Sequence, residues 1–355
     1  MNLKKTIRIT SKILLFVVLV LMFVLSIVNA PLFFANKKTT ETDYSSWMND
    51  NLILEAKVVD IAMLGAHDAF SHDIGISSTV DIKASDSLMQ GTIGKLIKGF
   101  SVRQSKTQTV SAKVLLESGV RYFDVRLSFN EIENEYYTVH NYFSTPIEEV
   151  LKEINIFLEA NPGEFIILDI QHVYGVDYND ETEFIKIREY FENAGILDYA
   201  YPDDIKSLGD ISYGDITNNQ AEAGVLIFSK FQVYDNLFWD YEGHIRSNWA
   251  NEDEYDKILE FLIEESVFIE ENPTYYSRLR IMQAVATMDM SIEGIFRSFE
   301  TWSLLNRAGK FNDYLVNTEE FESLLAAMPI VMVDYSSQKN FVDQIMPIII
   351  SYNNQ

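Results

Sequence analysis

The run FIILDIQH, residues 165–172, decides the fold class. Apart from Asp169, its first six residues are apolar, and the repeated isoleucines favour extended backbone. A strand that is apolar on both faces is typical of a parallel sheet covered by helices on both sides. Polar residues, Gln171 and His172, follow at its end. The run therefore predicts an α/β fold whose parallel strands end in polar side chains.

Similar runs recur along the chain, separated by amphipathic segments such as residues 145–160. We expect strands at 57–64, 119–127, 135–140, 164–170, 223–230, 279–287 and 329–335, with an eighth candidate at 243–249. Seven or eight strands alternating with helices are typical of a parallel (β/α) barrel or a doubly wound sheet. Because polar groups follow so many of the strands, we predict a TIM-like (β/α) barrel.

The composition excludes several classes of partner and site. The chain has 355 residues and a formal net charge of −25, with 53 Asp and Glu against 28 Lys and Arg. Such acidity argues against nucleic acid, whose affinity comes mainly from neutralised phosphates. The absence of cysteine excludes a disulfide framework, a thiolate zinc site and a lipid-modified cysteine anchor.

The N-terminus indicates a route to the membrane. Residues 1–12 carry four basic side chains and no acid, and residues 13–35 are almost wholly apolar. We interpret 1–12 as a cytoplasmic segment and 13–35 as a transmembrane signal-anchor helix, because that length spans about 30 Å of hydrocarbon. The alternative is a signal peptide cleaved after Ala30. Both interpretations export a polar linker, residues 36–47, and the predicted barrel, residues 48–355, so we expect a single-pass cell-membrane protein with an extracytoplasmic barrel.

Polar and charged side chains cluster at the carboxyl ends of the expected strands. They are His67, Asp68, Asp124, Arg126, His140, Asp169, Gln171, Lys230 and Asp334. In a single barrel they converge at one mouth. We interpret the other two histidines of these regions, His72 and His172, as structural.

These histidine, arginine and aspartate side chains are suited to phosphoryl transfer. One histidine can take a proton from an attacking hydroxyl while another protonates the leaving alkoxide. An arginine offers phosphate oxygens a planar, permanently charged fork. A buried aspartate behind a histidine fixes its tautomer and stabilises the imidazolium that forms. Because Arg126 can supply the positive charge, we expect neither a metal nor a cofactor.

A set of short motifs, in one order along the chain, resembles the X domain of phosphatidylinositol-specific phospholipase C. The motifs are LGAHD (64–68), SKTQ (105–108), GVRYFDVR (119–126), VH (139–140), FIILDIQHVYG (165–175), QAVAT (283–287) and PIVMVDY (329–335). The chain is most similar to the X-domain-only proteins and the metal-independent bacterial enzymes. The resemblance implies a TIM-like barrel that cleaves a glycerophospholipid phosphodiester at a lipid bilayer, through a cyclic inositol phosphate.

The resemblance also implies roles for the matching residues. His67 would be the general base on the inositol 2-hydroxyl, oriented by Asp334, and His140 the general acid to the leaving diacylglycerol. Arg126 would hold the phosphate, with Asp68 beside it. The calcium-dependent relatives carry acids at both positions of the motif that here reads Asp-x-Arg and ends at Arg126, so this pattern predicts calcium independence.

The headgroup side of the site is less defined by the motifs. The substrate-binding candidates are Asp124, Asp169, Gln171, Lys230 and Trp249. Asn141 follows the second histidine where the family commonly has glycine. Two alternatives stay open: a phosphodiesterase acting on other envelope glycolipids or lipid-linked glycans, and a non-catalytic barrel that binds a lipid headgroup.

Overall fold

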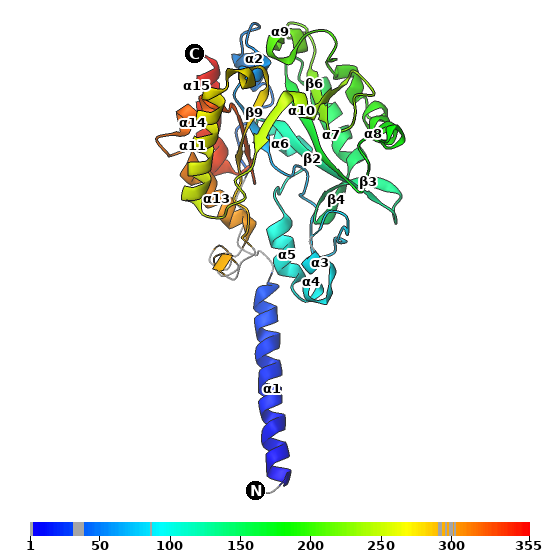
Figure 1. Ribbon diagram of the computed structural model, residues 1–355, viewed down its shortest axis with the longest axis vertical. Coiled ribbons are helices and arrows are strands. Elements are labelled where there is room, and N and C mark those ends of the chain that lie inside the picture. Colours follow the sequence, from blue (N-terminus) through cyan, green and yellow to red (C-terminus); the bar gives the residue numbers. More distant parts are fainter. Residues whose placement is uncertain are drawn as a thin grey trace.

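A helix projects from a body built of one curled sheet and its covering helices (Figure 1). The structure is a computed structural model, and it describes residues 3–30, 39–85, 87–289, 293, 294, 297, 301 and 303–355. The projecting helix is α1 (Leu3–Val28), with the N-terminus at its far end. The C-terminus lies on the body, at the end of α15 (Lys339–Asn353).

In the described part of the chain, eight parallel strands form the main body of a ten-stranded sheet. They are β1 (Met63–Ala66), β2 (Val120–Asn130), β5 (Phe165–Tyr174), β6 (Gly224–Ser229), β7 (Phe238–Asp240), β8 (Ile245–Asn248), β9 (Leu279–Ala284) and β10 (Ile330–Val333). Their spatial order is β7-β6-β5-β2-β1-β10-β9-β8. The last strand of the sequence, β10, therefore pairs with the first, β1. Within the described part of the chain no ladder joins β7 to β8. The predicted parallel (β/α) architecture is confirmed, and the sheet curls as a barrel left open between those two strands.

A short hairpin extends this sheet on the side of the mouth. β3 (Glu135–His140) pairs antiparallel with β2, and β4 (Tyr142–Pro146) pairs antiparallel with β3. The predicted strand at 135–140 is therefore present, but it lies outside the parallel barrel. β4 and β7 were absent from the prediction.

The prediction of a strand across 57–64 is wrong for most of its length. The structure has a 3-10 helix, Val58–Asp60, and β1 begins only at Met63. Val58 and Val59 are buried all the same, because the 3-10 turn packs beneath the barrel. An apolar run indicates burial, and here burial does not require extended backbone.

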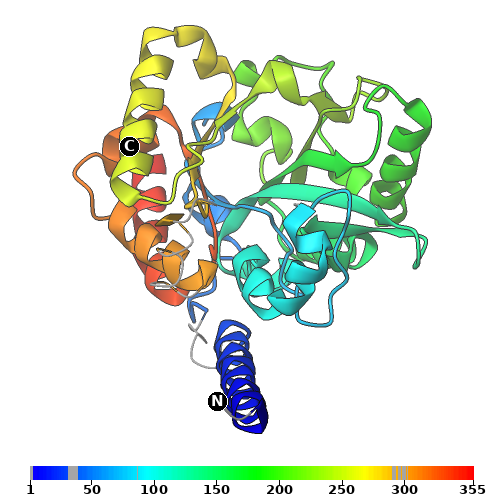
Figure 2. The same cartoon turned by 60° about the horizontal axis from the view of Figure 1, so that its bottom comes forward.

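Helices cover the outside of the sheet (Figure 2). Besides α1 and α15, the α-helices in the described part of the chain include α2 (Trp47–Asn51), α3 (Ser87–Gln90), α4 (Thr92–Leu96), α5 (Lys98–Ser105), α6 (Ala112–Glu117), α7 (Ile147–Ala160), α8 (Glu181–Asn193), α9 (Tyr213–Ile216), α10 (Tyr241–His244), α11 (Tyr255–Glu271), α13 (Leu304–Leu315) and α14 (Phe321–Ala327). In α7 the buried residues Val150, Ile154 and Leu158 recur every fourth position, which places one apolar stripe against the sheet.

Close packing joins β1 to both of its neighbours. A Cβ on Gly65 would lie 3.1 Å from the Tyr122 ring and 3.3 Å from the Met332 Cα, so a larger residue would require these neighbours to shift. At the opposite end of the barrel, Arg121 of β2 forms a fully buried ion pair with Glu164, with Nη2 2.7 Å from Oε2. These contacts fix the strands that carry the site.

The end of α1 lies against the segment between β1 and β2. The Asn29 side chain donates to the Leu96 carbonyl and accepts from the Gly99 amide, each at 2.7 Å. Arg103 of α5 donates to the carbonyls of Val28 at 2.6 Å and Ala30 at 2.5 Å. These bonds satisfy carbonyls that the end of a helix otherwise leaves unpaired.

The transmembrane prediction finds no support in the described helices. Among them, none combines the length and the apolar character needed to cross a membrane. The predicted span 13–35 and the predicted linker 36–47 both include residues outside the described part of the chain, namely 31–35 and 36–38.

Candidate active site

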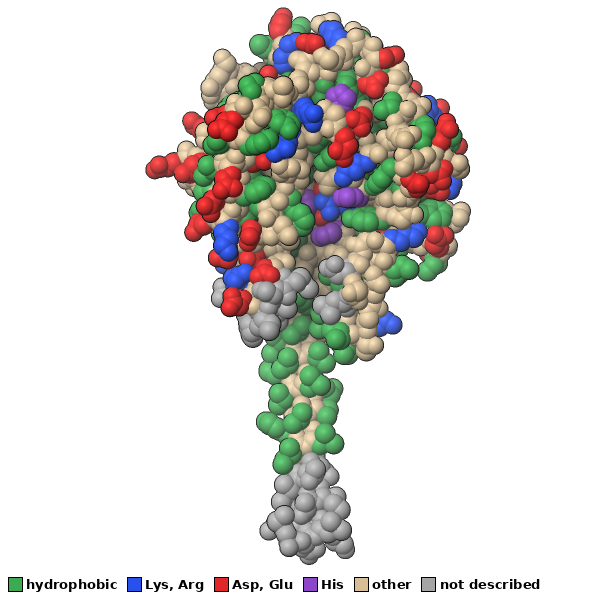
Figure 3. All heavy atoms as spheres, in the orientation of Figure 1, with side chains coloured by type: hydrophobic (Ala, Val, Ile, Leu, Met, Phe, Trp, Pro, Cys, Tyr) green, Lys and Arg blue, Asp and Glu red, His purple; other side chains and the backbone are tan. Residues whose placement is uncertain are grey.

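A cavity of about 470 Å³ opens at the carboxyl ends of the strands. Side chains from within β2 and β5, and others that follow β1, β8, β9 and β10, line it, together with His140 at the end of β3. Figure 3 shows histidine side chains gathered in a hollow on this face of the molecule. The site that the strand ends predict is thus a physical cavity.

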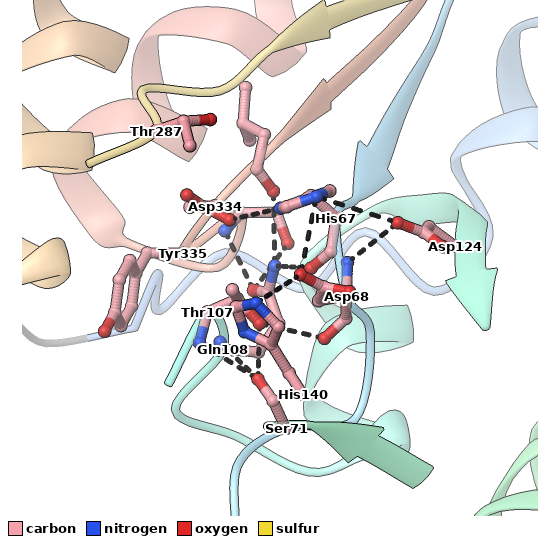
Figure 4. Close-up of polar contacts among 12 residues, drawn as sticks. His67, Asp68, Ser71, Thr107, Gln108, Asp124, His140, Thr287, Asp334 and Tyr335 are labelled. Carbon is pink, nitrogen blue, oxygen red and sulfur yellow. Dashed lines mark hydrogen bonds and ion pairs between the residues drawn. The ribbon is translucent and has the colours of Figure 1, made fainter. Parts of the chain in front are cut away.

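His67 follows β1 and is held by residues of the adjacent strand end. Its Nδ1 lies 2.7 Å from Asp334 Oδ1, and Asp334 follows β10, the neighbour of β1 (Figure 4). A carboxylate only accepts, so Nδ1 carries the proton and Nε2 faces the cavity. Burial alone would lower the pKa of His67, but the charges of Asp68 and Asp334 outweigh it and raise the pKa to about 9.

Arg126 connects two carboxylates to His67. Its Nε lies 2.6 Å from Asp68 Oδ1, and its Nη2 lies 3.0 Å from Asp124 Oδ2 and 3.2 Å from His67 Nε2. Arginine can only donate, so the last contact is a hydrogen bond when His67 is neutral. Burial would raise the pKa of Asp68, but Arg126 and the imidazoles of His140 and His67 lower it to about 2.

His140 approaches from the opposite side. Its Nδ1 lies 2.7 Å from the Ser105 carbonyl, which can only accept, so this nitrogen carries a proton and Nε2 faces the site. Nε2 is 3.4 Å from Asp68 Oδ2, the same oxygen that lies 3.4 Å from His67 Nε2. The two ring centroids are 6.5 Å apart. Two imidazoles therefore face one another across a single carboxylate.

Asn141, which stands where the family commonly has glycine, has a φ of +63°. That left-handed conformation favours glycine, and asparagine is among the other residues that tolerate it best. The substitution therefore leaves the turn after His140 intact. The Asn141 side chain donates to Ser105 Oγ at 3.2 Å, beside the carbonyl that holds His140.

The SKTQ motif supports the two strand ends that carry the site (Figure 4). Gln108 donates to the carbonyls of His67 at 3.1 Å and Val333 at 3.2 Å, so it links the ends of β1 and β10. Thr107 donates to the Asp68 carbonyl at 2.9 Å. These bonds fix the backbone on both sides of the His67–Asp334 pair.

The structure separates the substrate-binding candidates into two groups. Gln171 and Trp249 line the cavity, whereas Asp124, Asp169 and Lys230 are not among its lining residues. Asp124 orients Arg126 from beneath. The Lys230 ammonium lies 4.6 Å from the centre of the Tyr241 ring.

Asp169 is completely buried and accepts a 2.5 Å hydrogen bond from Tyr122. Burial, and then the charge of Asp124, raise its pKa to about 8, so it is mostly protonated at neutral pH. His172 does line the cavity. Burial, and then the charges of Lys230 and Arg126, lower its pKa to about 4, so this histidine is neutral.

Several lining residues were missed by the sequence reasoning. Thr107, Gln283 and Thr287 fall within quoted motifs, which is a signal that could have identified them. Asn251 and Arg307 lie outside every motif. Arg307 comes from α13, and only the fold brings that helix to the cavity.

One group of side chains has the spacing of a cation site. Ligand atoms of His67, Asp68 and Asp124 all lie within 4.8 Å of one another. Arg126 donates to Asp124 and forms an ion pair with Asp68, so its guanidinium places a positive charge where a cation would otherwise be needed.

The fold and the site define a barrel of the phosphatidylinositol-specific phospholipase C type, with two facing histidines and a central arginine. By structure, the chain is similar to phosphatidylinositol-specific phospholipase C from Listeria monocytogenes, with a TM-score of 0.58 and 17% identity over 88% of this chain and 99% of that one. No family model matches the sequence.

Curated relatives carry the same family name. A PI-PLC X-box domain-containing protein of Dictyostelium discoideum is 27% identical over 315 residues, which is 85% of this chain and 40% of that protein. The variant-surface-glycoprotein phospholipase C of Trypanosoma brucei brucei is 37% identical over 141 residues, 37% of this chain and 39% of that protein. The chain thus spans about two fifths of these relatives. Together these findings confirm the resemblance to the PI-PLC X-domain family.

Proposed function

We propose that the chain is a phosphodiesterase that cleaves an inositol-containing glycerophospholipid by metal-independent acid–base catalysis. One observation carries this proposal: His67 and His140 each direct Nε2 toward the same cavity, with Arg126 beside them. The name of the Dictyostelium discoideum relative, which refers to PI-PLC, supports the substrate class.

The first half-reaction follows from this geometry. His67 Nε2 takes the proton of the inositol 2-hydroxyl as its oxygen attacks phosphorus, and Asp334 stabilises the imidazolium that forms. The bond from phosphorus to the glycerol oxygen breaks, and His140 Nε2–H protonates that oxygen to release diacylglycerol. Arg126 neutralises the charge that develops on the phosphoryl oxygens.

The product of this step is a cyclic inositol 1,2-phosphate. In the second half-reaction the two histidines exchange roles. His140 takes a proton from water, whose oxygen attacks phosphorus, and His67 returns its proton to the 2-oxygen as the ring opens. Each histidine then regains its starting state. The arginine that bridges Asp68 and Asp124 supports metal independence.

We further propose that α1 and the apolar residues after it attach the barrel to a membrane, with the barrel outside the cytoplasm. The apolar side chains of residues 13–24 are exposed, although exposure of such a long apolar surface to water is unfavourable. The basic residues of 1–12 favour the cytoplasmic side. Cell fractionation combined with protease accessibility from outside tests both parts of this proposal.

The activity is tested by following diacylglycerol release from mixed micelles of phosphatidylinositol by the full chain. The proposal expects turnover with a chelator present and none in His140→Gln. Turnover that requires added calcium would contradict metal independence. Because one relative is named for a surface glycoprotein, a glycosylated phosphatidylinositol is the second substrate, and cleavage of that lipid alone would favour the glycolipid alternative. A folded protein that binds phosphatidylinositol without cleaving either lipid would be a headgroup-binding barrel.

A further inference from the structure

Arg307 is a buried cation in the wall of the cavity. It lies near the start of α13, four residues after the N-cap Ser303, and only 3% of it is exposed. Arg307 lines the cavity that also contains His67 and Arg126. Among the residues that the structure describes, neither Nη1 nor Nη2 has a hydrogen-bond partner. Burial of a guanidinium that has no partner is strongly unfavourable, so we expect an anion to bind beside Arg307.

The acids of the cavity cannot serve as that anion. Asp68 and Asp334 are the acidic residues among its described lining residues. Asp334 is already bound to His67 at 2.7 Å, and Asp68 to Arg126 at 2.6 Å. Outside the cavity, the nearby Asp253 is paired with Arg297 at 2.9 Å.

α13 is fixed relative to the reaction centre. Asn312, on the same helix as Arg307, donates to the backbone carbonyl of Asp334 at 2.9 Å. The wall around Arg307 otherwise carries neutral groups, among them Gln283 and Thr287. The Thr287 hydroxyl accepts a 2.9 Å hydrogen bond from Trp249. Arg307 is therefore a positive charge in the cavity lining, held in place by the helix that also contacts Asp334.

We propose that Arg307 forms a second anion-binding site in this cavity, for a phosphate-like group other than the phosphodiester at Arg126. A guanidinium binds the oxygens of such a group in a bidentate manner. The group has two sources: a second phosphate on the headgroup of the ligand, or free inorganic phosphate. The first source rests on the proposed function, whereas the second does not.

Calorimetry on the full chain in detergent micelles tests the site with three probes: inositol 1-phosphate, inositol 1,4-bisphosphate and inorganic phosphate. Arg307→Met removes the charge at similar length. Lys310→Gln, on the same helix and exposed, is the matched control. Wild type is expected to bind the bisphosphate roughly 10- to 100-fold more tightly than the monophosphate. Arg307→Met should lose this preference but keep its affinity for the monophosphate, and Lys310→Gln should behave as wild type.

The results distinguish a phosphate carried by the ligand from free phosphate, and they distinguish failure of the anion site from failure of the proposed function. Loss of the preference in Arg307→Met supports a phosphate carried by the ligand. Binding of two inorganic phosphates by wild type and one by Arg307→Met, without a preference for the bisphosphate, supports free phosphate. If the monophosphate does not bind but phosphate binding still depends on Arg307, the proposed function fails and the site stands. Equal affinities of wild type and Arg307→Met for all three probes would overturn the site.

A measurement of Tm distinguishes anion binding by Arg307 from a purely structural role. Removing an unpartnered buried charge should raise the Tm of Arg307→Met, whereas loss of a structural ion pair would lower it. A lower Tm with unchanged affinities would assign Arg307 to structure and overturn the proposal. Arg307→Lys keeps the charge without the fork and should retain only part of the preference, so the comparison remains available if Arg307→Met does not fold.

Discussion

Asp334→Asn should shift the pH at which His67 becomes a base. In the wild type the pKa of His67 is raised to about 9, so only about 1% of it is neutral at pH 7. The proposed mechanism requires neutral His67 and protonated His140 in the free enzyme, so kcat/KM should rise about tenfold per pH unit below pH 9 as long as His140 keeps its proton. Asparagine keeps an oxygen near Nδ1 but removes one of the two charges that raise this pKa.

The structure sets the size of this shift. A carboxylate at 2.7 Å commonly moves a pKa by about one to three units. Burial continues to lower the pKa of His67 in Asp334→Asn, so its ascending limb should move toward neutral pH by about that amount. The maximal rate should fall at the same time, because the imidazolium of the transition state loses its counter-charge.

The assay is kcat/KM from pH 6 to 10 for wild type and Asp334→Asn, with His67 also titrated by NMR. Asp177→Asn makes the same chemical change at an exposed position and should leave the profile unchanged. An ascending limb that stays at the same pH in Asp334→Asn would refute the role of Asp334.

Stability should depend on pH for the same reason. A raised folded-state pKa stabilises the protein below pH 6.5, and this contribution is lost as pH rises through about 9. The difference of 9 − 6.5 units corresponds to about 3 kcal/mol. Urea unfolding at pH 6 and pH 10 should show this loss in wild type, and a smaller loss in Asp334→Asn.

Three other changes test separate parts of the structure. Arg126→Lys loses the fork that bridges two carboxylates, so kcat should fall about 100- to 1,000-fold, in steady-state assays with the chelator present. An unaltered kcat would contradict its placement at the phosphate. Glu164→Gln leaves Arg121 buried without its counter-charge and should lower the free energy of unfolding by about 3–5 kcal/mol in urea titrations, a loss that an exposed pair would not show. Arg103→Leu removes the bonds to the end of α1 and should increase proteolysis at residues 28–30, whereas protection equal to wild type would argue against this contact.

The strand pattern of the sequence predicts the barrel because its buried strands are largely apolar on both faces. β6, β9 and β10 are buried at every position, and each falls within a predicted run. β7 has three residues and could not be recognised, since so short a strand has no periodicity of its own. The opening between β7 and β8 is a property of pairing between strands, which no local pattern encodes.

The residues of the reaction centre were easier to predict from the sequence than the residues expected to bind the headgroup. His67 and Asp334 follow the paired strands β1 and β10, and Asp124 and Arg126 lie within β2, which pairs with β1, so the strand pattern predicts that these side chains lie close together. Asp169 lies within β5 and bonds to Tyr122, and Lys230 follows β6; neither side chain lines the cavity. Which way a side chain points beyond a strand end depends on the loop that follows it. Arg307 lies on a helix after β9, and its place in the cavity follows only from the packing of α13.

The most direct test of the two-histidine mechanism is the identity of the first phosphorus-containing product. Phosphatidylinositol vesicles are incubated with the full chain and a chelator, and phosphorus NMR follows the products of wild type and His67→Ala. This mechanism predicts that a cyclic inositol phosphate accumulates first and then opens to the monoester, and that neither product forms with His67→Ala. A monoester that appears without a cyclic precursor, or equal turnover by His67→Ala, would contradict the two-histidine mechanism.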